Sequence, residues 1–422
     1  MSIIKSTLSR RSRSAVQSAV ASIALLLSAC ASDWSPMPVD TSAFLERSQT
    51  QEDDGVRVTA AVPSKAESQA IFDANVYKRG VQPVWIEVVN NREDAVVFLP
   101  LSTDADYFTP LEAASMHANK KNKNDMERYF FANGAKLSIA PGEVRSGFVF
   151  THPDEGTKSF NVDIFGDDDS WHYTFFIPVP GLKIDHYYVD FAAMYSVDEV
   201  AHVDTGALIA ALEALPCCVK DKKGENDGDP LNIAVVGDPK DVYYAFIRAG
   251  WDETEAVGAS SGLKTAISFI SGGEYRYSPV SSLYVYGRPQ DIALQKARDN
   301  IHERNHLRLW MSPMKFEGKA VWIGQISRDI GVRFTSKTIT THKIDPDVDE
   351  TREYLLENLA YHQALQRFGY VAGTVPAPID TPRQNLTGDP YFTDGLRVVL
   401  WVSSDQISLD EIDMVDWKHP RN

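Results

Sequence analysis

Between residues 69 and 216, the chain consists mainly of short apolar runs separated by polar turns. The runs are rich in β-branched and aromatic residues and cover 84–89, 95–101, 137–140, 146–151, 160–165 and 173–179. Turn-forming clusters such as Pro141-Gly142-Glu143 and Gly166-Asp167-Asp168-Asp169 lie between them. Short strands at this spacing are typical of an antiparallel sandwich. We therefore predict an N-terminal antiparallel β-sandwich domain at residues 69–216.

The pattern changes after residues 217–230, which are mostly polar and which we interpret as a linker. The apolar run 231–236 predicts a buried strand, and Asp238-Pro239 predicts the start of a helix that ends at Gly250. Further strands are expected at 266–270, 282–286, 306–311, 320–326 and 396–402, with a long helix at about 346–368. This mixture predicts an α+β domain at 231–375. In the C-terminal extension, 376–422, the strand at 396–402 is expected to close the sheet. The predicted fold class is therefore multidomain, with an N-terminal antiparallel β-sandwich followed by an α+β domain.

The N-terminus has a different pattern, in which basic residues precede one apolar run, 15–29. The basic residues are Lys5, Arg10, Arg11 and Arg13. The run is short for a membrane-spanning helix, which needs about 20 apolar residues, and suits the core of a signal peptide. It ends in Leu27-Ser28-Ala29-Cys30, which resembles a lipobox. We expect a signal peptide at 1–29, a lipid on Cys30 and membrane attachment through that lipid.

Residues 30–68 are rich in Ser, Pro, Asp and Glu, and this composition predicts a lipidated N-terminus followed by a tether. Ala31 stands where an inner-membrane retention signal would place aspartate. The predicted location is therefore the cell envelope, at the outer membrane facing the periplasm.

Charge narrows the range of partners. The chain carries 42 basic and 58 acidic side chains, a net charge of −16 that falls to about −20 without the four basic residues of the leader. Such a surface repels phosphate backbones and excludes nucleic acid as a partner. The expected partners are the membrane and a protein or small ligand of the envelope. The sequence identifies no particular cofactor.

The chain contains three cysteines, and two of them, Cys217 and Cys218, are adjacent. In an oxidising compartment they could form a vicinal disulfide. They could instead bind a soft metal such as copper, or remain free or intermolecularly oxidised thiols.

Several ordered phrases of the C-terminal half are similar to the LssY C-terminal domain family, over residues 231 to about 375. The phrases are Pro230-Leu231-Asn232, Tyr284-Val285-Tyr286-Gly287-Arg288, Arg304-Asn305-His306-Leu307-Arg308-Leu309-Trp310, Val321-Trp322-Ile323-Gly324, Ser327-Arg328-Asp329 and His342-Lys343-Ile344-Asp345-Pro346-Asp347-Val348-Asp349. The resemblance implies a role in secretion or in the cell envelope. Members occur alone or joined to membrane phosphatase-type domains, and this sequence shows no such part, so the resemblance predicts no particular reaction.

Polar residues within these phrases are the candidates for a site. On a strand at 306–311, every second side chain shares one face, which is expected to be exposed or to line a cleft. The catalytic candidates are His306, Asp329 and His342; the ligand-binding candidates are Arg308, Trp310 and Asp345; the metal candidates are His306, His342 and Asp345. Two histidines with carboxylates could bind a metal ion or act as acid and base beside an anion-binding arginine.

A purely structural interpretation of the same residues is also open. Asp345-Pro346 can begin a helix, and the arginines can pair with nearby carboxylates. Two functional hypotheses follow. The first is an envelope lipoprotein that acts as a binding or accessory module. The alternative is a metal-assisted hydrolase of a phosphorylated or acylated envelope substrate, which requires His306, Asp329 and His342 to lie within a few ångströms of one another.

Overall fold

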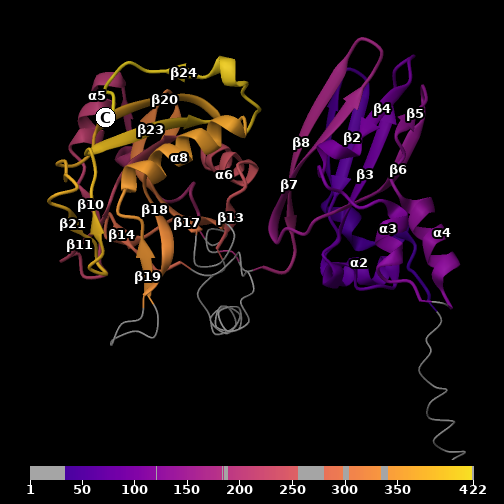
Figure 1. Cartoon of the computed structure of the whole chain (residues 1–422). Helices are drawn as coiled ribbons and strands as arrows, with labels where there is room; N and C mark the ends of the chain where they lie inside the picture. The colour runs from indigo at the N-terminus through magenta and orange to yellow at the C-terminus, as the bar shows by residue number, and fades with distance from the viewer. Residues whose placement is uncertain are drawn as a thin grey trace, which may run out of the picture.

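The structure is a computed structural model that describes residues 34–119, 121–182, 184, 189–254, 280–297, 304–333 and 341–420. For residues 332, 333, 341 and 342 only the backbone is described. Cys30, the expected signal peptide and the strand predicted at 266–270 lie outside the described residues. Figure 1 shows two β-rich domains, the N-terminal one in indigo to magenta and the C-terminal one in magenta to yellow.

Two four-stranded antiparallel sheets form the N-terminal domain, as predicted. One sheet contains, in order, β1 (Gln49–Asp53), β2 (Val56–Ala61), β3 (Gln82–Asn90) and β6 (Val144–Thr151). The other contains β5 (Ser138–Ile139), β4 (Val96–Leu99), β7 (Gly156–Phe165) and β8 (Ser170–Val179). Side chains from the two sheets meet in one apolar core, where Val84 and Ile86 belong to the same cluster as Val162 and Ile164.

Three helices cover the outer face of the first sheet. They are α2 (Lys65–Phe72), α3 (Pro110–Ser115) and α4 (Lys123–Asn133). Trp85 and Phe148 point away from the sandwich core and pack in a second cluster with Phe72 and Phe130. The helices α2 and α3 begin with capping boxes, Ser64 with Glu67 and Thr109 with Glu112, which fix their starting points. None of the three helices was predicted.

Part of the predicted tether is folded. Strands β1 and β2 lie within residues 30–68, and β2 pairs along its whole length with β3. Phe44, in the short 3-10 helix η2 (Ala43–Arg47), is fully buried in the helix-covered cluster. The tether prediction is therefore wrong for residues 42–61, because alternate residues of β2 fill the core although the segment is polar on average.

A ten-stranded mixed sheet dominates the C-terminal domain and, with its helices, confirms the α+β prediction. Its main order is β13 (Asp252–Glu253), β16 (Ile292–Ala297), β17 (Arg304–Phe316), β18 (Lys319–Arg333), β12 (Ile233–Val236), β23 (Leu396–Val402), β20 (Leu365–Ala372) and β24 (Asp413–Met414). In addition, β19 (Thr341–Ile344) pairs with β18, and β9 (Ala201–Val203) pairs with β17.

Both faces of this sheet are covered. Helices α6 (Pro239–Arg248) and α8 (Val348–Tyr361) pack on one face, where Phe246 and Leu355 meet Leu307 and Leu309 of β17. The other face is covered by α5 (Thr205–Glu213) and by a small sheet. The small sheet has the order β11 (Asp227–Pro230), β10 (Cys218–Lys220), β14 (Tyr284–Val285) and β15 (Arg288–Pro289). A separate hairpin joins β21 (Arg383–Gln384) to β22 (Pro390–Tyr391).

Three features of this domain differ from the predictions. The helix predicted at 346–368 ends at Tyr361, and Leu365 and Phe368 lie in β20, paired with β23. The predicted linker, 217–230, contains β10 and β11, which pair with each other and belong to the small sheet. The strand predicted at 396–402 has those bounds, but it lies inside the sheet between β12 and β20 and does not close an edge.

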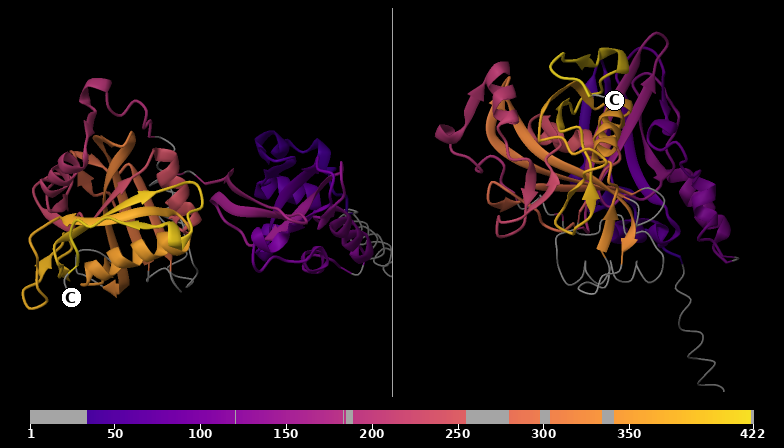
Figure 2. Two further views of the ribbon diagram at one scale, coloured as in Figure 1. Left: turned by 90° about the horizontal axis from the view of Figure 1, so that it is seen from above. Right: turned by 60° about the vertical axis from the view of Figure 1, so that its left-hand side comes forward.

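The two domains touch through β8 and α6. Phe176 of β8 stacks on Tyr244 of α6 with ring centroids 4.0 Å apart, and it belongs to the apolar core of the C-terminal domain. Figure 2 shows that the long strands of the N-terminal domain reach toward the C-terminal domain. Among the described residues, no helix combines the length and the apolar character that crossing a membrane requires.

Candidate functional site

His306 and Asp329 meet on adjacent strands. β17 and β18 pair so that His306 lies opposite Ser327, which places Asp329 on the same face two residues further along. The His306 Nε2 atom is 2.7 Å from Asp329 Oδ2, and Asp329 is buried. Burial lowers the pKa of His306 below its ordinary value, although the Asp329 carboxylate acts in the opposite direction. Burial thus favours the neutral form of the imidazole, which the Asp329 carboxylate orients.

Arg308 lies on the same face, two residues from His306, and is also buried. Its Nη1 donates to Gln325 Oε1 at 2.9 Å, and its Nε donates to the carbonyl oxygen of Ser281 at 3.1 Å. Burial lowers the pKa of Arg308 to about 10, and nearby carboxylates offset part of this effect. The guanidinium is thus charged at neutral pH, and these two hydrogen bonds go to neutral oxygens.

Arg304 extends this row by two more residues toward the start of β17. Its exposed fraction is 4%, and its Nη1 donates to Gln295 Oε1 on β16 at 2.8 Å. Within the described part of the chain, Arg304 Nε and Gln325 Nε2 are buried donors that have no hydrogen-bond acceptor. Such donors carry a cost of about 1–3 kcal/mol each unless an acceptor reaches them.

Asp229 approaches from the covering layer, at the end of β11. It accepts a hydrogen bond from Asn385 Nδ2 at 3.0 Å, and burial raises its pKa, an effect that Arg308 reduces. It completes a set of charged and polar side chains between the large sheet and the small one, all buried except the partly buried His306. We call this set the polar cluster: Asp229, Arg304, His306, Arg308, Gln325 and Asp329.

Trp310 has a different role from the one predicted. It shares the face of His306 and Arg308, as expected, but it is completely buried among Leu208, Val285 and Ile323. Its Nε1 donates to the carbonyl oxygen of Arg288 at 3.3 Å. α5 and the small sheet cover this face, so the predicted exposure is wrong for Trp310, which is a core residue.

The other two candidates, His342 and Asp345, lie near β19. His342 pairs with Val332 of β18, three residues beyond Asp329, and its side chain lies outside the described part of the structure. Asp345 is engaged at the start of α8, where its Oδ1 accepts a hydrogen bond from the amide of Asp347 at 3.1 Å. The helix-start interpretation therefore accounts for the contacts of Asp345.

Three members of the polar cluster were not predicted: Asp229, Arg304 and Gln325. The sequence does indicate Arg304, because alternate residues of a strand share one face and Arg304 alternates with His306 and Arg308. It does not indicate Gln325 and Asp229. Their place depends on the register of β17 with β18 and on the folding of β11 over the sheet.

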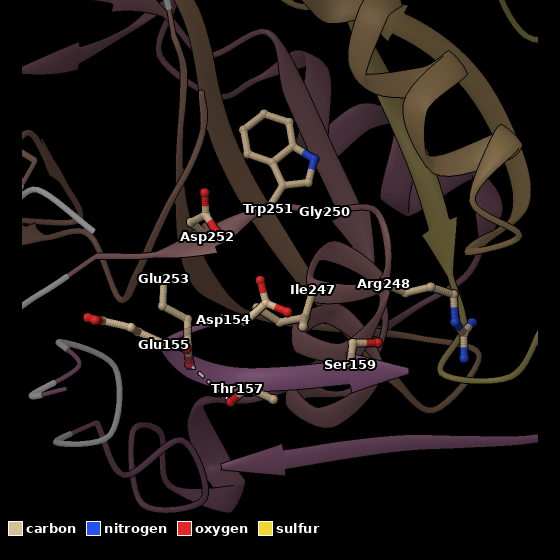
Figure 3. A pocket seen from close by; sticks show the side chains of 10 residues that line it. All are labelled: Asp154, Glu155, Thr157, Ser159, Ile247, Arg248, Gly250, Trp251, Asp252 and Glu253. Atoms are coloured by element: carbon tan, nitrogen blue, oxygen red, sulfur yellow. Dashed lines mark hydrogen bonds between the residues drawn. The ribbon is translucent and has the colours of Figure 1, made fainter. Parts of the chain in front are cut away.

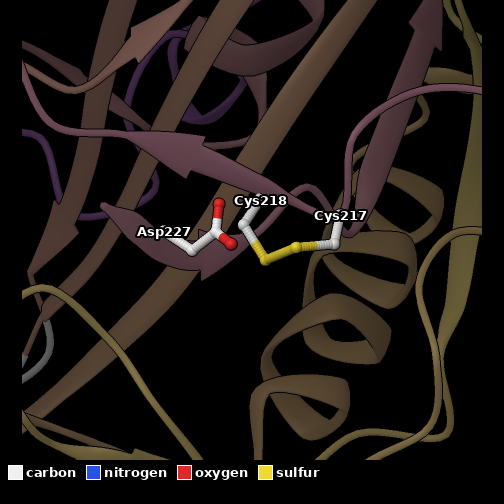
Figure 4. A group of neighbouring side chains, drawn as sticks. All are labelled: Cys217, Cys218 and Asp227. Atoms are coloured by element: carbon white, nitrogen blue, oxygen red, sulfur yellow. A yellow bond between two sulfur atoms is a disulfide. The ribbon is translucent and has the colours of Figure 1, made fainter. Parts of the chain in front are cut away.

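Cys217 and Cys218 form a disulfide between adjacent residues (Figure 4). The carboxylate of Asp227 on β11 lies next to them, and the two sulfurs and a carboxylate oxygen are all within 4.8 Å of one another. In the part of the chain that the structure describes, this is the only such group of three or more potential metal ligands. No described histidine belongs to it.

A cavity of about 180 Å³ lies between the two domains (Figure 3). Asp154 and Glu155 line it from the N-terminal domain, and Asp252 and Glu253 line it from the C-terminal domain. Thr157 Oγ1 lies 2.6 Å from Tyr243 Oη and 3.4 Å from Glu253 Oε1, so hydroxyl groups link the domains beside the cavity. None of the candidate site residues from the sequence lines this cavity.

No curated protein matches the chain. A family model described as LssY C-terminus matches residues 212–396, which extends the resemblance predicted for about 231–375 at both ends. The match includes only the end of α5, the small sheet and most strands of the large sheet, together with the polar cluster and the adjacent cysteines. Residues 212–396 of this chain are therefore similar to the LssY C-terminal family.

Proposed function

We propose that the protein is a lipid-anchored lipoprotein of the cell envelope that acts as a binding or accessory module. In this proposal the lipid on Cys30 attaches it to the outer membrane, facing the periplasm. The basic leader and the sequence Leu27-Ser28-Ala29-Cys30 support the anchor. The C-terminal domain then binds a small ligand in the polar cluster through an anionic group of phosphate or carboxylate type.

The observation that carries this proposal is the surplus of buried hydrogen-bond donors. A guanidinium has five N–H donors, and buried donors normally find acceptors. Arg304 and Arg308 donate to amide and carbonyl oxygens, while Arg304 Nε and Gln325 Nε2 have no acceptor among the described residues. A ligand rich in acceptor oxygens fits this arrangement.

Charge favours an anion over a neutral ligand. Two arginines face Asp329, whereas burial raises the pKa of Asp229 and lowers that of His306. Both shifts favour the uncharged form of the group, beside two arginines that supply positive charge. Guanidinium groups bind carboxylate and phosphate in a bidentate geometry, which neutral ligands cannot match.

The test is calorimetric titration of the full-length chain in detergent with inorganic phosphate and, separately, with acetate. Replacement Arg308→Gln removes a charged donor, which is worth about 1.5–3 kcal/mol, so binding should weaken roughly tenfold to a hundredfold. Arg128→Gln is the matched control, because Arg128 is an exposed arginine of α4. Circular dichroism and denaturant unfolding establish that each variant is folded.

The two anions distinguish the groups that a natural ligand could carry. Phosphate binding alone indicates a phosphorylated ligand, and acetate binding alone indicates a carboxylate. If neither anion binds, or if folded Arg308→Gln binds as well as the unaltered protein, the polar cluster is a structural network and the proposal fails.

The His306–Asp329 pair favours a second candidate, hydrolysis of a phosphorylated or acylated envelope substrate. A carboxylate that orients a histidine is the arrangement used for general acid–base catalysis. Turnover of phosphate monoesters and of acyl esters should then fall by at least about a hundredfold in His306→Gln and in Asp329→Asn. The metal-assisted form also requires bound zinc or manganese that is lost in both His306→Ala and His342→Ala. If the unaltered protein turns over none of these esters, the hydrolase candidate fails and the binding-module proposal remains.

A further inference from the structure

The adjacent cysteines lie beside a carboxylate on the neighbouring strand, and this group is separate from the polar cluster. Cys218 begins β10 and Asp227 begins β11, and the hairpin between the two strands turns the chain back on itself. The register pairs Cys218 with Pro230 and Lys220 with Asp227. Figure 4 shows the Asp227 side chain directed toward the disulfide.

The group is accessible from solvent on one side. Cys217 is half-buried and Asp227 is exposed, whereas Cys218 is buried with its sulfur 3.8 Å from the hydroxyl of Tyr391. An external thiolate can therefore attack the Cys217 sulfur, and the electrons remain with Cys218 in the first step of exchange.

No other free thiol of this chain is expected to exchange with the disulfide. The third cysteine is Cys30, the residue expected to carry the lipid. Reduction of the disulfide thus leaves two thiols next to each other and next to one carboxylate. Two sulfurs and one oxygen are a ligand set that zinc accepts.

We propose that Cys217, Cys218 and Asp227 form a redox-gated site for Zn²⁺. A dithiol reductant transfers two electrons and two protons to the disulfide and is itself oxidised to a disulfide, so the protein gains two thiols. Zn²⁺ then displaces both thiol protons and binds the two thiolates and a carboxylate oxygen of Asp227. In the oxidised state each sulfur is bonded to the other, and the thiolate ligands do not exist.

The distances are compatible with this step. Zinc binds sulfur at about 2.3 Å and carboxylate oxygen at about 2.0–2.2 Å, so tetrahedral ligands lie roughly 3.3–3.8 Å from one another. The three ligand atoms already lie within 4.8 Å, and breaking the S–S bond lets the sulfurs separate. Asp227 Oδ1 faces Lys220 Nζ at 2.6 Å, and its second oxygen lies outside that ion pair.

The test compares oxidised and reduced full-length chain in detergent under anaerobic conditions. A phosphine serves as reductant, because it cleaves the disulfide without adding a competing thiol. After incubation with zinc and gel filtration, the reduced chain should retain one zinc per molecule and the oxidised chain none. Substitution of cobalt for zinc should give a thiolate-to-cobalt charge-transfer band, a spectroscopic signature that bound carboxylates alone do not produce.

Two variants and a control assign the ligands. Cys217→Ser should abolish zinc retention, and Asp227→Asn should weaken it roughly tenfold, equivalent to about 1.4 kcal/mol. Cys217 is half-buried and Asp227 exposed, which makes both changes compatible with folding. Glu225→Gln, at an exposed carboxylate of the same hairpin, should bind zinc as the unaltered protein does.

Several results would overturn the inference. Zinc retained equally by the oxidised chain or by Cys217→Ser is adventitious binding to other acidic groups. A reduced chain whose two thiols are confirmed by thiol titration, but which retains no zinc, also excludes the site. Equal affinity in Asp227→Asn and the unaltered protein removes Asp227 from it.

Discussion

His306 is the residue whose protonation should most directly report on the polar cluster. Its pKa in the folded protein is lowered by burial, against the influence of Asp329 and with that of Arg304 and Arg308. The unfolded chain therefore takes up the proton first as the pH falls below about 6.5, the ordinary value for histidine. Above that pH, His306 should make its full contribution to the free energy of unfolding. Below it, the free energy of unfolding should decline by up to about 1.4 kcal/mol per pH unit until the folded-state pKa is reached.

The measurement is denaturant unfolding of the chain without residues 1–31 at a series of pH values between 7 and 5, about two units in which a histidine normally titrates. His306→Gln should remove part of the decline. The remainder belongs in part to His117 and His362, whose pKa values are also lowered by burial. His172→Gln, at an exposed histidine of the N-terminal domain, is the control for the substitution itself. The prediction is contradicted if the free energy of unfolding of His306→Gln declines with falling pH as steeply as that of the unaltered protein.

Single residues also show where sequence reasoning about the site stops. Strand alternation correctly grouped His306, Arg308 and Trp310 on one face, because a strand has a period of two. The same alternation contains no information about what covers that face. The covering layer comes from α5 and from β10 and β11, and the polar sequence around β10 and β11 resembles a linker.

Gly324 fixes the spacing of three strands at the centre of the large sheet. It lies in β18 between Leu309 of β17 and Ile233 of β12. A methyl group there would meet Ile233 Cγ1 at 2.5 Å and Leu309 Cδ2 at 2.7 Å. Gly324→Ala should therefore lower the free energy of unfolding by about 1–3 kcal/mol, because side chains in a packed core cannot all move aside.

A glycine in a helix provides the contrast. Gly206 lies in the first turn of α5, and a Cβ there meets only Asp204 Oδ1 at an ordinary 3.6 Å. Gly206→Ala should raise the free energy of unfolding by about 0.4–1 kcal/mol, since alanine loses less backbone entropy on folding. Urea unfolding of both variants is the measurement. Destabilisation by Gly206→Ala, or a neutral Gly324→Ala, means that packing has been misjudged.

Elements with a strong local pattern were predicted well, and those that depend on distant pairing were not. The apolar runs of β3 and β23 match their observed positions, and the run 320–326 matches the first half of β18. The predicted long helix extends into β20 because Tyr354, Tyr361, Leu365 and Phe368 repeat at helical spacing. In the structure the backbone at Gln363 has φ 56°, which ends the helix, and Leu365 then pairs with Val402. Pairing with a strand some forty residues away outweighs the local pattern.

At the scale of the whole molecule, one ring from the N-terminal domain belongs to the core of the C-terminal domain. Phe176 of β8 is buried against Tyr244, and the Arg248 guanidinium lies 5.5 Å from the centre of the Phe176 ring. Nearby, Gln406 Nε2 donates to Asn161 Oδ1 at 3.2 Å, which adds a polar link between the domains. Most contacts within each domain do not involve this interface, so each domain has its own core.

Phe176→Ala should therefore uncouple the domains without unfolding either of them. Loss of a buried phenylalanine costs about 3–5 kcal/mol in a core, and here that cost reduces mainly the free energy of docking. Thermal unfolding should separate into two transitions, and small-angle X-ray scattering should show a larger radius of gyration. Phe165→Ala, at an exposed ring near the far end of β7, is the control and should change neither observable. If Phe176→Ala unfolds in one transition with unchanged scattering, the two domains form a single cooperative unit whose coupling resides elsewhere, as in the hydroxyl contacts of Thr157 and Tyr243.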